Sequence, residues 1–327
     1  MMDCTDRHFR YLARLLSRHA MLYTEMITTG ALLCGNAARH LAYHPVEHPV
    51  GVQLGGCVPA ELAQCARMAA DAGYDEVNLN VGCPSDRVQS ARFGACLMAE
   101  PTLVAECVSA MQAAVAIPVT VKTRLGIDDQ DSYEALIGFV QTVAAAGCQT
   151  FTLHARKAFL KGLNPKENRT VPPLRYDLVK QVKQEMPQLE IIINGGFANL
   201  AAAKAQLDTL DGVMLGREVY ANPYLLSAVD GEFYGVDTPV PTRHEVLADY
   251  LKYMQQEIAT GTALHHLARH LLGLFQGQPG ARQFRRYLSE HMHARGADVS
   301  VVLEAAKQVQ RVREYEDKPY QTDVASA

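Results

Sequence analysis

The residue best suited to chemistry is a cysteine that directly follows a predicted strand. Residues 77–81 alternate apolar and amide side chains, and the turn Gly82-Cys83-Pro84 ends this run abruptly. An ordinary thiol carries its proton at neutral pH. Cys83 could therefore act as a general acid, and no base stands next to it in the sequence to make it a nucleophile. Cys96 follows thirteen residues later in the apolar stretch GACLM, where we expect it to pack rather than react.

Two glycine turns end consecutive strand-like runs near the middle of the chain. One run ends in Asn194-Gly195-Gly196 and the next in Gly216-Arg217. Glycines at such turns let backbone N–H groups approach an anion, and the last two turns of a parallel barrel commonly bind phosphate. Either turn alone could be an ordinary turn, but the pair favours a phosphate site.

Two basic side chains end neighbouring strand-like runs. Lys122 interrupts the apolar VTVKT, and such a lysine could form a buried ion pair, act as a Schiff-base nucleophile, or face a cofactor. His154 ends the next run, where a lone histidine is more often structural than catalytic. Together with Gln53 and the phosphate turns, these residues could hold a flavin mononucleotide, although another phosphorylated ligand fits equally well. No cluster has metal-ligand spacing and no carboxylate pair suits glycoside hydrolysis, so we predict no metal.

The elements that must position these residues alternate between strand and helix. Seven strands are predicted at 21–26, 50–56, 76–82, 118–124, 150–156, 190–196 and 212–218. Amphipathic helices are predicted between them at 61–73, 102–115, 132–147, 176–186 and 200–207. Gly73 and Gly147 each stand where a left-handed glycine would end a helix.

This alternation indicates parallel strands covered by helices. Polar residues recur at the C-terminal ends of the strands, which favours a (β/α)8 TIM barrel over the main rival, an open doubly wound sheet. The chain opens on a helix, with Thr5 or Asp6 as its N-cap, so we expect the first of the eight strands to be truncated.

A second domain follows the barrel. After residue 242 only helical periodicity is found, which predicts a small all-helical domain. We assign 1–235 to the barrel, 236–316 to the helical domain and 317–327 to a disordered tail.

Composition and charge narrow the class of protein. The chain has 327 residues, 48% of them hydrophobic, a net charge of −4, and eight cysteines without a CxxC pair. With no signal peptide or long apolar run, we expect a reduced, cytoplasmic protein that does not enter membranes.

Residues 155–175 contain six Lys and Arg against Glu167 alone, and residues 265–295 contain five Arg against Glu290 alone. Two such runs favour contact with a nucleic-acid backbone.

An ordered set of stretches resembles the tRNA-dihydrouridine synthase family from Met1 to about Arg313. These stretches are LNVGCPSDRVQ, FGACLM, VTVKTRLGIDDQDSY, HARKAFLKGLNPKENR, INGG, DGVMLGRE and FQGQPGARQFRRYLSE. PKENR and GARQFRRYLSE are similar to the A subfamily in particular.

The resemblance implies a flavin (FMN) barrel enzyme with a helical tRNA-binding domain. Such enzymes reduce the C5–C6 bond of uridine at positions 20 and 20a of the tRNA D-loop, with NADPH as reductant. Reduced FMN gives hydride to C6, and the residue implied to protonate C5 is Cys83. The implied FMN-binding residues are Met1, Met2, Gln53, Lys122, His154, Asn194, Gly195, Gly196, Gly216 and Arg217. The implied tRNA-binding residues are Asn80, Lys166, Arg169, Arg282 and Arg285.

One departure from the family pattern lies at the start of the chain. Family members carry a first strand whose tip lies beside the flavin, and only Met1-Met2 remains of it here. We hypothesise that the start codon is placed too late.

Other functions stay open on the residues alone. The barrel could be another FMN oxidoreductase acting on a small pyrimidine or enone, a non-catalytic tRNA binder, or an aldolase with Lys122 as Schiff base. We expect a monomer.

Overall fold

The computed structural model describes residues 1–237 and 239–309 and divides into two compact units. The first holds Met1–Arg10 and Arg18–Glu218, and the second holds Tyr11–Ser17 and the chain from Val219 onward. Within the second unit the Gly273 backbone lies against the Ala221 carbonyl, which ties residues 219–237 to the later helices. The two units divide between Glu218 and Val219, before the predicted domain boundary at 235. The functions assigned to the two domains remain predictions. The predicted tail at 317–327 lies outside the described residues.

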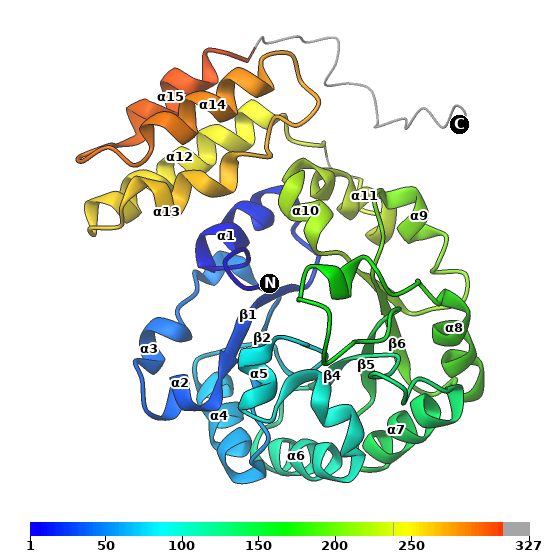
Figure 1. The fold of residues 1–327 in the computed structure, drawn as a ribbon. Helices are drawn as coiled ribbons and strands as arrows, with labels where there is room; N and C mark the ends of the chain where they lie inside the picture. Colours follow the sequence, from blue (N-terminus) through cyan, green and yellow to red (C-terminus); the bar gives the residue numbers. More distant parts are fainter. Residues whose placement is uncertain (238, 310–327) are drawn as a thin grey trace. The chain divides into compact units, whose positions relative to one another are not determined.

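The first unit is built on one parallel sheet of seven strands in chain order. The strands are β1 (Leu22–Thr28), β2 (Val50–Gly55), β3 (Glu76–Val81), β4 (Val119–Arg124), β5 (Thr150–His154), β6 (Glu190–Asn194) and β7 (Gly212–Met214). A doubly wound sheet reverses its strand order, so that rival is wrong. Figure 1 shows the strands curling round with the helices outside them, which confirms a TIM-barrel-like fold. Among the described residues the pairing starts at β1 and ends at β7, and no ladder joins these two.

The five predicted outer helices are all present. They are α4 (Pro59–Asp71), α6 (Pro101–Ala114), α7 (Tyr133–Ala145), α8 (Tyr176–Glu185) and α9 (Leu200–Lys204). Gly73 and Gly147 follow α4 and α7 with φ of +94° and +107°, as predicted. The sequence did not indicate the short helices α2 (Thr29–Leu33), α3 (Ala37–His40), α5 (Asp86–Ser90) and α10 (Arg217–Ala221). The predicted seventh strand is shorter than 212–218 because α10 already begins at Arg217.

Alternation along the strands separates an apolar outer face from a polar inner face. On β3, Val77, Leu79 and Val81 are fully buried, beneath the helices that Figure 1 shows outside the strands. The intervening Asn78 and Asn80 point the other way, because successive strand residues face opposite sides. This polar inner face departs from the branched apolar layers that usually fill such barrels, and it carries the site.

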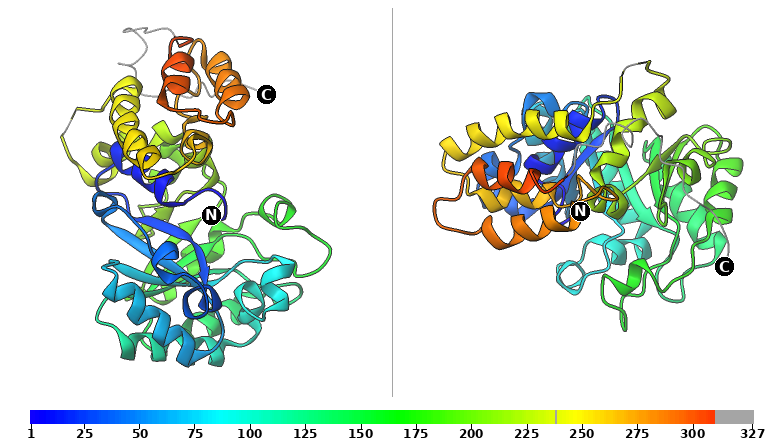
Figure 2. Two further views of the ribbon diagram at one scale, coloured as in Figure 1. Left: turned by 90° about the vertical axis from the view of Figure 1, so that its left-hand side faces the viewer. Right: turned by 90° about the horizontal axis from the view of Figure 1, so that it is seen from above.

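The second unit is helical. It contains α12 (Arg243–Ala259), α13 (Leu264–Ala268), α14 (Ala281–His291) and α15 (Val299–Ala306), together with α11 (Val229–Tyr234). Thr242 and Glu245 form a capping box at the start of α12. Figures 1 and 2 show α12 to α15 packed against one another.

The helix at the start of the chain, α1 (Arg7–Leu16), contributes to both units. Its N-cap is Asp6, whose carboxylate accepts from the N–H groups of His8 and Phe9, both at 3.0 Å. Within the second unit the Tyr11 ring stacks on Tyr253 at a centroid distance of 3.8 Å.

Nowhere in the described part of the chain is a helix both long and apolar enough to span a membrane.

Candidate functional site

The loop that carries Cys83 is anchored through its backbone. Asn80 Oδ1 accepts from the N–H of Gly82 at 3.1 Å and from that of Cys83 at 3.0 Å. The Cys83 carbonyl accepts from Ala95 N–H at 2.9 Å, in the short helix η2 (Gly94–Ala99). Gly94 (φ +76°) is required there, because a Cβ at that position would meet the Cys83 carbonyl oxygen at 2.6 Å. The thiol itself stays half-buried, so it is fixed in place and still reachable.

Arg124 adds a third anchor and links this loop to another. Its guanidinium is buried and donates from Nε to Gly82 O at 3.0 Å. Its Nη1 donates to Lys157 O at 3.1 Å and to Asn168 O at 2.9 Å. Burial lowers the pKa of Arg124 to about 10, so it remains a cation at neutral pH. Arg124 thus connects the Cys83 loop with the basic loop that follows β5.

Gln53 and Asn80 face each other inside the barrel. Gln53 Oε1 accepts from Asn80 Nδ2 at 2.8 Å, and Gln53 Nε2 donates to Asn78 Oδ1 at 2.9 Å. An amide can make up to four hydrogen bonds, so Gln53 keeps a free N–H and a free lone pair. Either could meet the polar edge of a flavin ring, in keeping with the role predicted for it.

Lys122 and His154 lie close enough to interact electrostatically. Lys122 Nζ donates to Asn194 Oδ1 at 3.2 Å across the barrel interior. Burial and the neighbouring Arg124 lower the pKa of Lys122 to about 8, so the amine is mostly protonated at pH 7. Burial and nearby cations, Arg124 first, hold the pKa of His154 well below its usual range, so its imidazole is neutral. A protonated lysine beside a neutral histidine suits a ligand with localised negative charge and hydrogen-bonding edges.

The glycine turn after β6 needs its glycines. Gly195 and Gly196 have φ of +118° and +80°, and a Cβ on Gly195 would lie 2.7 Å from His154 Cδ2. The Tyr176 hydroxyl donates to Gly195 O at 2.6 Å and fixes the turn. Asn194 is held as well, because its Nδ2 donates to Met214 O at 2.7 Å. Glycine is therefore required at this turn, and hydrogen bonds from Tyr176 and Asn194 hold the turn in place.

The charged groups that act most strongly on His154, whose ring lies against this turn, are cations. His154 feels Arg124, Lys122, Arg156 and Arg217, all cationic. Arg156 Nη1 donates to the Pro172 carbonyl, while its buried Nε has no hydrogen-bond partner. This one unpaired buried N–H, within a cluster of cations, is a donor that a bound anion could satisfy. The chemistry of this set fits the phosphate and ring of FMN.

Met1 and Met2 differ in their surroundings. Met1 Sδ lies 3.2 Å from where a Cβ on Gly216 would be, so Met1 borders the second predicted phosphate turn. Met2 is 57% exposed. Arg217, the next residue after Gly216, donates from Nη2 to Arg169 O at 3.2 Å.

The basic run at 155–175 is weaker than its composition indicates. Lys157 pairs with Asp131 and Arg175 with Asp177, both at 2.8 Å. Lys166 and Arg169 are exposed around the one-turn helix η3 (Glu167–Arg169). In the second unit, Arg282 and Arg285 are exposed on α14, and Arg285 donates to Gln276. These four side chains are accessible, as a role in tRNA binding requires.

Asn168 organises the basic loop and was not predicted. Fully buried, it donates from Nδ2 to Phe159 O and Leu163 O and accepts from Phe159 N–H at 2.7 Å. Its place in the middle of PKENR was the available signal, because a loop amide among charged residues is a frequent organiser of turns.

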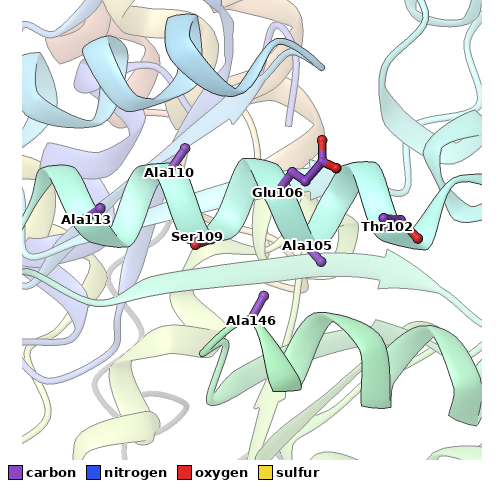
Figure 3. Close-up of a pocket in the computed structure, with 7 residues that line it drawn as sticks. All are labelled: Thr102, Ala105, Glu106, Ser109, Ala110, Ala113 and Ala146. Atoms are coloured by element: carbon purple, nitrogen blue, oxygen red, sulfur yellow. The ribbon is translucent and has the colours of Figure 1, made fainter.

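An open groove on the outside of α6 lies apart from these residues. It is lined mostly by small side chains, among them Ala105, Ser109 and Ala113, with Ala146 across from them (Figure 3). None of the predicted site residues lines it. Within the described residues, no group of three His, Cys, Asp or Glu side chains could hold a metal ion.

Comparison with known proteins places the chain in a family. The family model described as dihydrouridine synthase (Dus) matches residues 1–311. A relative from Vibrio cholerae named tRNA-dihydrouridine(20/20a) synthase is 57% identical over 94% of each chain. Relatives of the same name from Shewanella oneidensis and Escherichia coli are each 58% identical, and cover 92% and 93% of their own length and 95% and 94% of this chain. The solved structure of morphinone reductase matches with a TM-score of 0.49 at 13% identity, over 75% of this chain and 85% of that one, a likeness too weak to argue from.

The matches confirm the resemblance drawn from the sequence motifs, and with it the expectation of an oxidoreductase. The chain belongs to the dihydrouridine synthase family.

Proposed function

We propose that this protein reduces uridine to 5,6-dihydrouridine in the D-loop of tRNA, at positions 20 and 20a, with FMN as bound cofactor and NADPH as reductant. The observation that carries the proposal is the anchored Cys83 loop at the same end of the barrel as the cation-lined turn at Gly195. The curated relatives bear the name of this activity.

Membership in the family implies a flavin, and the residues present fit FMN. Gly195, Gly196 and Arg217 would hold its phosphate through backbone N–H groups and a guanidinium. Lys122 and the neutral His154 would meet the polar edges of the ring system, with Gln53 on the other side. When bound, the flavin supplies hydride to C6 of the uracil ring. The protonated Lys122 would stabilise negative charge that builds up on its ligand.

Cys83 would supply the proton to C5. Its loop is held by Asn80, Ala95 and Arg124. The thiol would therefore lose little conformational entropy when it is positioned against one atom of the substrate. A thiol that acts as an acid needs its proton and no activating base. Asn80 already contacts the loop, and its remaining donor would bond the target base.

The target uridine must leave its stack to reach the interior of a barrel. The exposed Lys166 and Arg169 in the first unit, and Arg282 and Arg285 in the second, would bind the tRNA backbone. We infer that the protein acts in the cytoplasm, since tRNA is the substrate, and we propose that it is a monomer.

The test uses purified protein and tRNA from a strain that lacks dihydrouridine at these positions. The protein should be yellow or become so with FMN, oxidise NADPH, and form dihydrouridine at 20 and 20a, mapped by mass spectrometry of nuclease fragments. Arg282→Ala combined with Arg285→Ala is the matched variant for tRNA binding: flavin reduction should be unchanged and the salt dependence of binding shallower. Protein that binds no FMN, or that leaves the tRNA unmodified, contradicts the proposal.

A further inference from the structure

A chain of side-chain hydrogen bonds begins at the N-terminal end of β3 and runs inside the barrel. The Thr120 hydroxyl donates to Glu76 Oε1 at 2.5 Å, and Asn78 Nδ2 donates to Thr120 Oγ1 at 2.8 Å. Gln53 Nε2 then donates to Asn78 Oδ1 at 2.9 Å. Asn78 and Thr120 are buried, so water cannot easily replace these bonds.

The same chain continues to the Cys83 loop. Asn80 Nδ2 donates to Gln53 Oε1 at 2.8 Å, and Asn80 Oδ1 accepts from the N–H groups of Gly82 and Cys83. We name the five side chains that link β3 to the loop the amide relay: Glu76, Thr120, Asn78, Gln53 and Asn80. Strand alternation explains it, because Glu76, Asn78 and Asn80 share one face of β3, and Asn78 pairs with Gln53 on one side and Thr120 on the other.

Both ends of the amide relay fix its direction. The backbone N–H groups of Gly82 and Cys83 can only donate, and an ionised Glu76 can only accept. Every bond between them donates toward Glu76. Turning over one amide would set donor against donor at one side and acceptor against acceptor at the other, and a buried mismatch is costly.

We propose that Glu76 and Thr120 are positioning residues: through the amide relay they set the orientation of Gln53 and Asn80 and hold the Cys83 loop in its reactive place. This inference rests on the proposed function, in which Cys83 delivers a proton and Gln53 faces the flavin. Neither Glu76 nor Thr120 touches the reacting atoms.

The surroundings of Glu76 make the relay sensitive to pH. Besides Thr120 on β4, the groups that interact with it are the Tyr23 hydroxyl on β1, which donates to it, Glu190 on β6, and the buried thiol of Cys148, just before β5. Burial raises the pKa of Glu76, and the hydrogen bonds from Thr120 and Tyr23 lower it only in part. As the pH falls through this raised pKa, the carboxyl gains a proton and ceases to be a pure acceptor. At pH values below this pKa, the hydrogen bonds of the relay should no longer be forced to donate toward Glu76.

The raised pKa of Glu76 also lets an experiment distinguish a positioning role from a contribution to folding stability. A carboxyl whose pKa is raised in the folded protein lowers the stability as the pH rises through that pKa, because its charged form is disfavoured by folding. Glu76→Gln removes this cost at neutral pH, so it should not lower the melting temperature. If Glu76 served only the stability of the fold, the same substitution would lower the melting temperature.

The test compares Thr120→Val, which keeps the shape and removes the hydroxyl, with Thr120→Ser, which keeps the hydroxyl. Thr150→Val is the matched control, because Thr150 also donates to a glutamate on the next strand, Glu190 at 2.7 Å, and is no member of the relay. The first measurement is amide hydrogen exchange at Gly82 and Cys83, read by NMR on each full-length protein. The second is kcat and KM for tRNA, with NADPH oxidation measured separately.

In Thr120→Val we expect exchange at both amides to rise about two- to tenfold and kcat to fall by about tenfold, with a smaller change in KM. Thr120→Ser should restore both, and Thr150→Val should leave both unchanged. In the wild type, part of the fall of kcat at low pH should come from protonation of Glu76. Glu76→Gln should abolish that part of the fall. Unchanged exchange in a folded Thr120→Val protein, or a loss of stability without loss of kcat, overturns the proposal. Exchange does not depend on tRNA chemistry, so a wild-type protein that forms no dihydrouridine would count against the proposed function alone.

Discussion

Cys83 and Cys96 are both half-buried and thirteen residues apart, yet their surroundings differ. Cys83 Sγ lies 3.5 Å from Ser85 Oγ, on a loop whose backbone is anchored by Asn80 and Arg124. Cys96 Sγ donates to the Phe93 carbonyl at 3.1 Å, and burial raises its pKa. Exposure alone would not separate the two thiols. Two other properties separate them. The backbone of the Cys83 loop is anchored by side chains, whereas the Cys96 thiol is itself engaged in a hydrogen bond to a carbonyl.

The strongest test of this contrast removes the proposed acid. Cys83→Ala should lower dihydrouridine formation by about 10²- to 10⁴-fold, the usual contribution of a general acid. FMN binding and NADPH oxidation should persist, because the loop backbone is held by groups other than the thiol. Absorbance spectra and tRNA mass spectrometry measure both quantities. Full activity in this variant would remove Cys83 from the mechanism.

A second variant loosens the loop and leaves the thiol in place. Arg124→Lys keeps the charge but cannot hold three carbonyls from two loops, so we expect a loss of about 1–3 kcal/mol in the free energy of unfolding. The kcat should fall by about tenfold, because Cys83 is less well aimed. Chemical denaturation and steady-state kinetics provide the measurements. An unchanged kcat at reduced stability would show that the anchor serves the fold alone.

The raised pKa of Cys96 gives a pH prediction. A thiol reacts as its thiolate, so a raised pKa lowers the reactive fraction at any given pH. Alkylation of Cys96 by iodoacetamide should therefore rise at higher pH than alkylation of the same thiol in the unfolded chain. Peptide mapping after timed alkylation between pH 7 and pH 10 would show the shift. Coincident profiles for the folded and unfolded chain would contradict it.

The smallest effect is expected from removing the second thiol. Cys96→Ala deletes one weak hydrogen bond to a carbonyl, and activity should stay within about twofold of the wild type. The assay is the one used for Cys83→Ala, so the two variants form a matched pair. A large loss here would mean that Cys96 takes part in the reaction and that the contrast between the thiols is false.

Much of the fold follows from local sequence patterns. Alternating strand and helix periodicity predicted all seven strands, and the barrel is confirmed over the doubly wound rival. Short helices such as α5 and α10 escaped prediction, because their five residues stand alone between turns, whereas the equally short α9 begins a longer run, 200–207, with a helical pattern. The early end of β7 was missed as well, because its apolar residues lie directly before the predicted phosphate turn and sequence alone does not mark where pairing stops.

The site was predicted as a set of strand ends, and the structure adds the bonds between them. Lys122 and His154 interact electrostatically, and the prediction that they hold one ligand remains a prediction. The hydrogen-bond partners of Asn168 and those within the amide relay could not be found in this way. Each depends on which hydrogen-bond donor meets which acceptor across strands or loops, and one sequence does not contain that pairing.

The sequence by itself determined the family, the order of strands and helices, and the cysteine on a rigid turn, because these depend on residue types at short spacing. Only the tertiary structure decided that Lys157, in the basic run at 155–175, pairs with Asp131. It alone also decided that the Cys83 loop is anchored from three directions. The physical reason is the same in both cases: charges and hydrogen bonds act over a few ångströms in space, and the partners here come from different strands and loops.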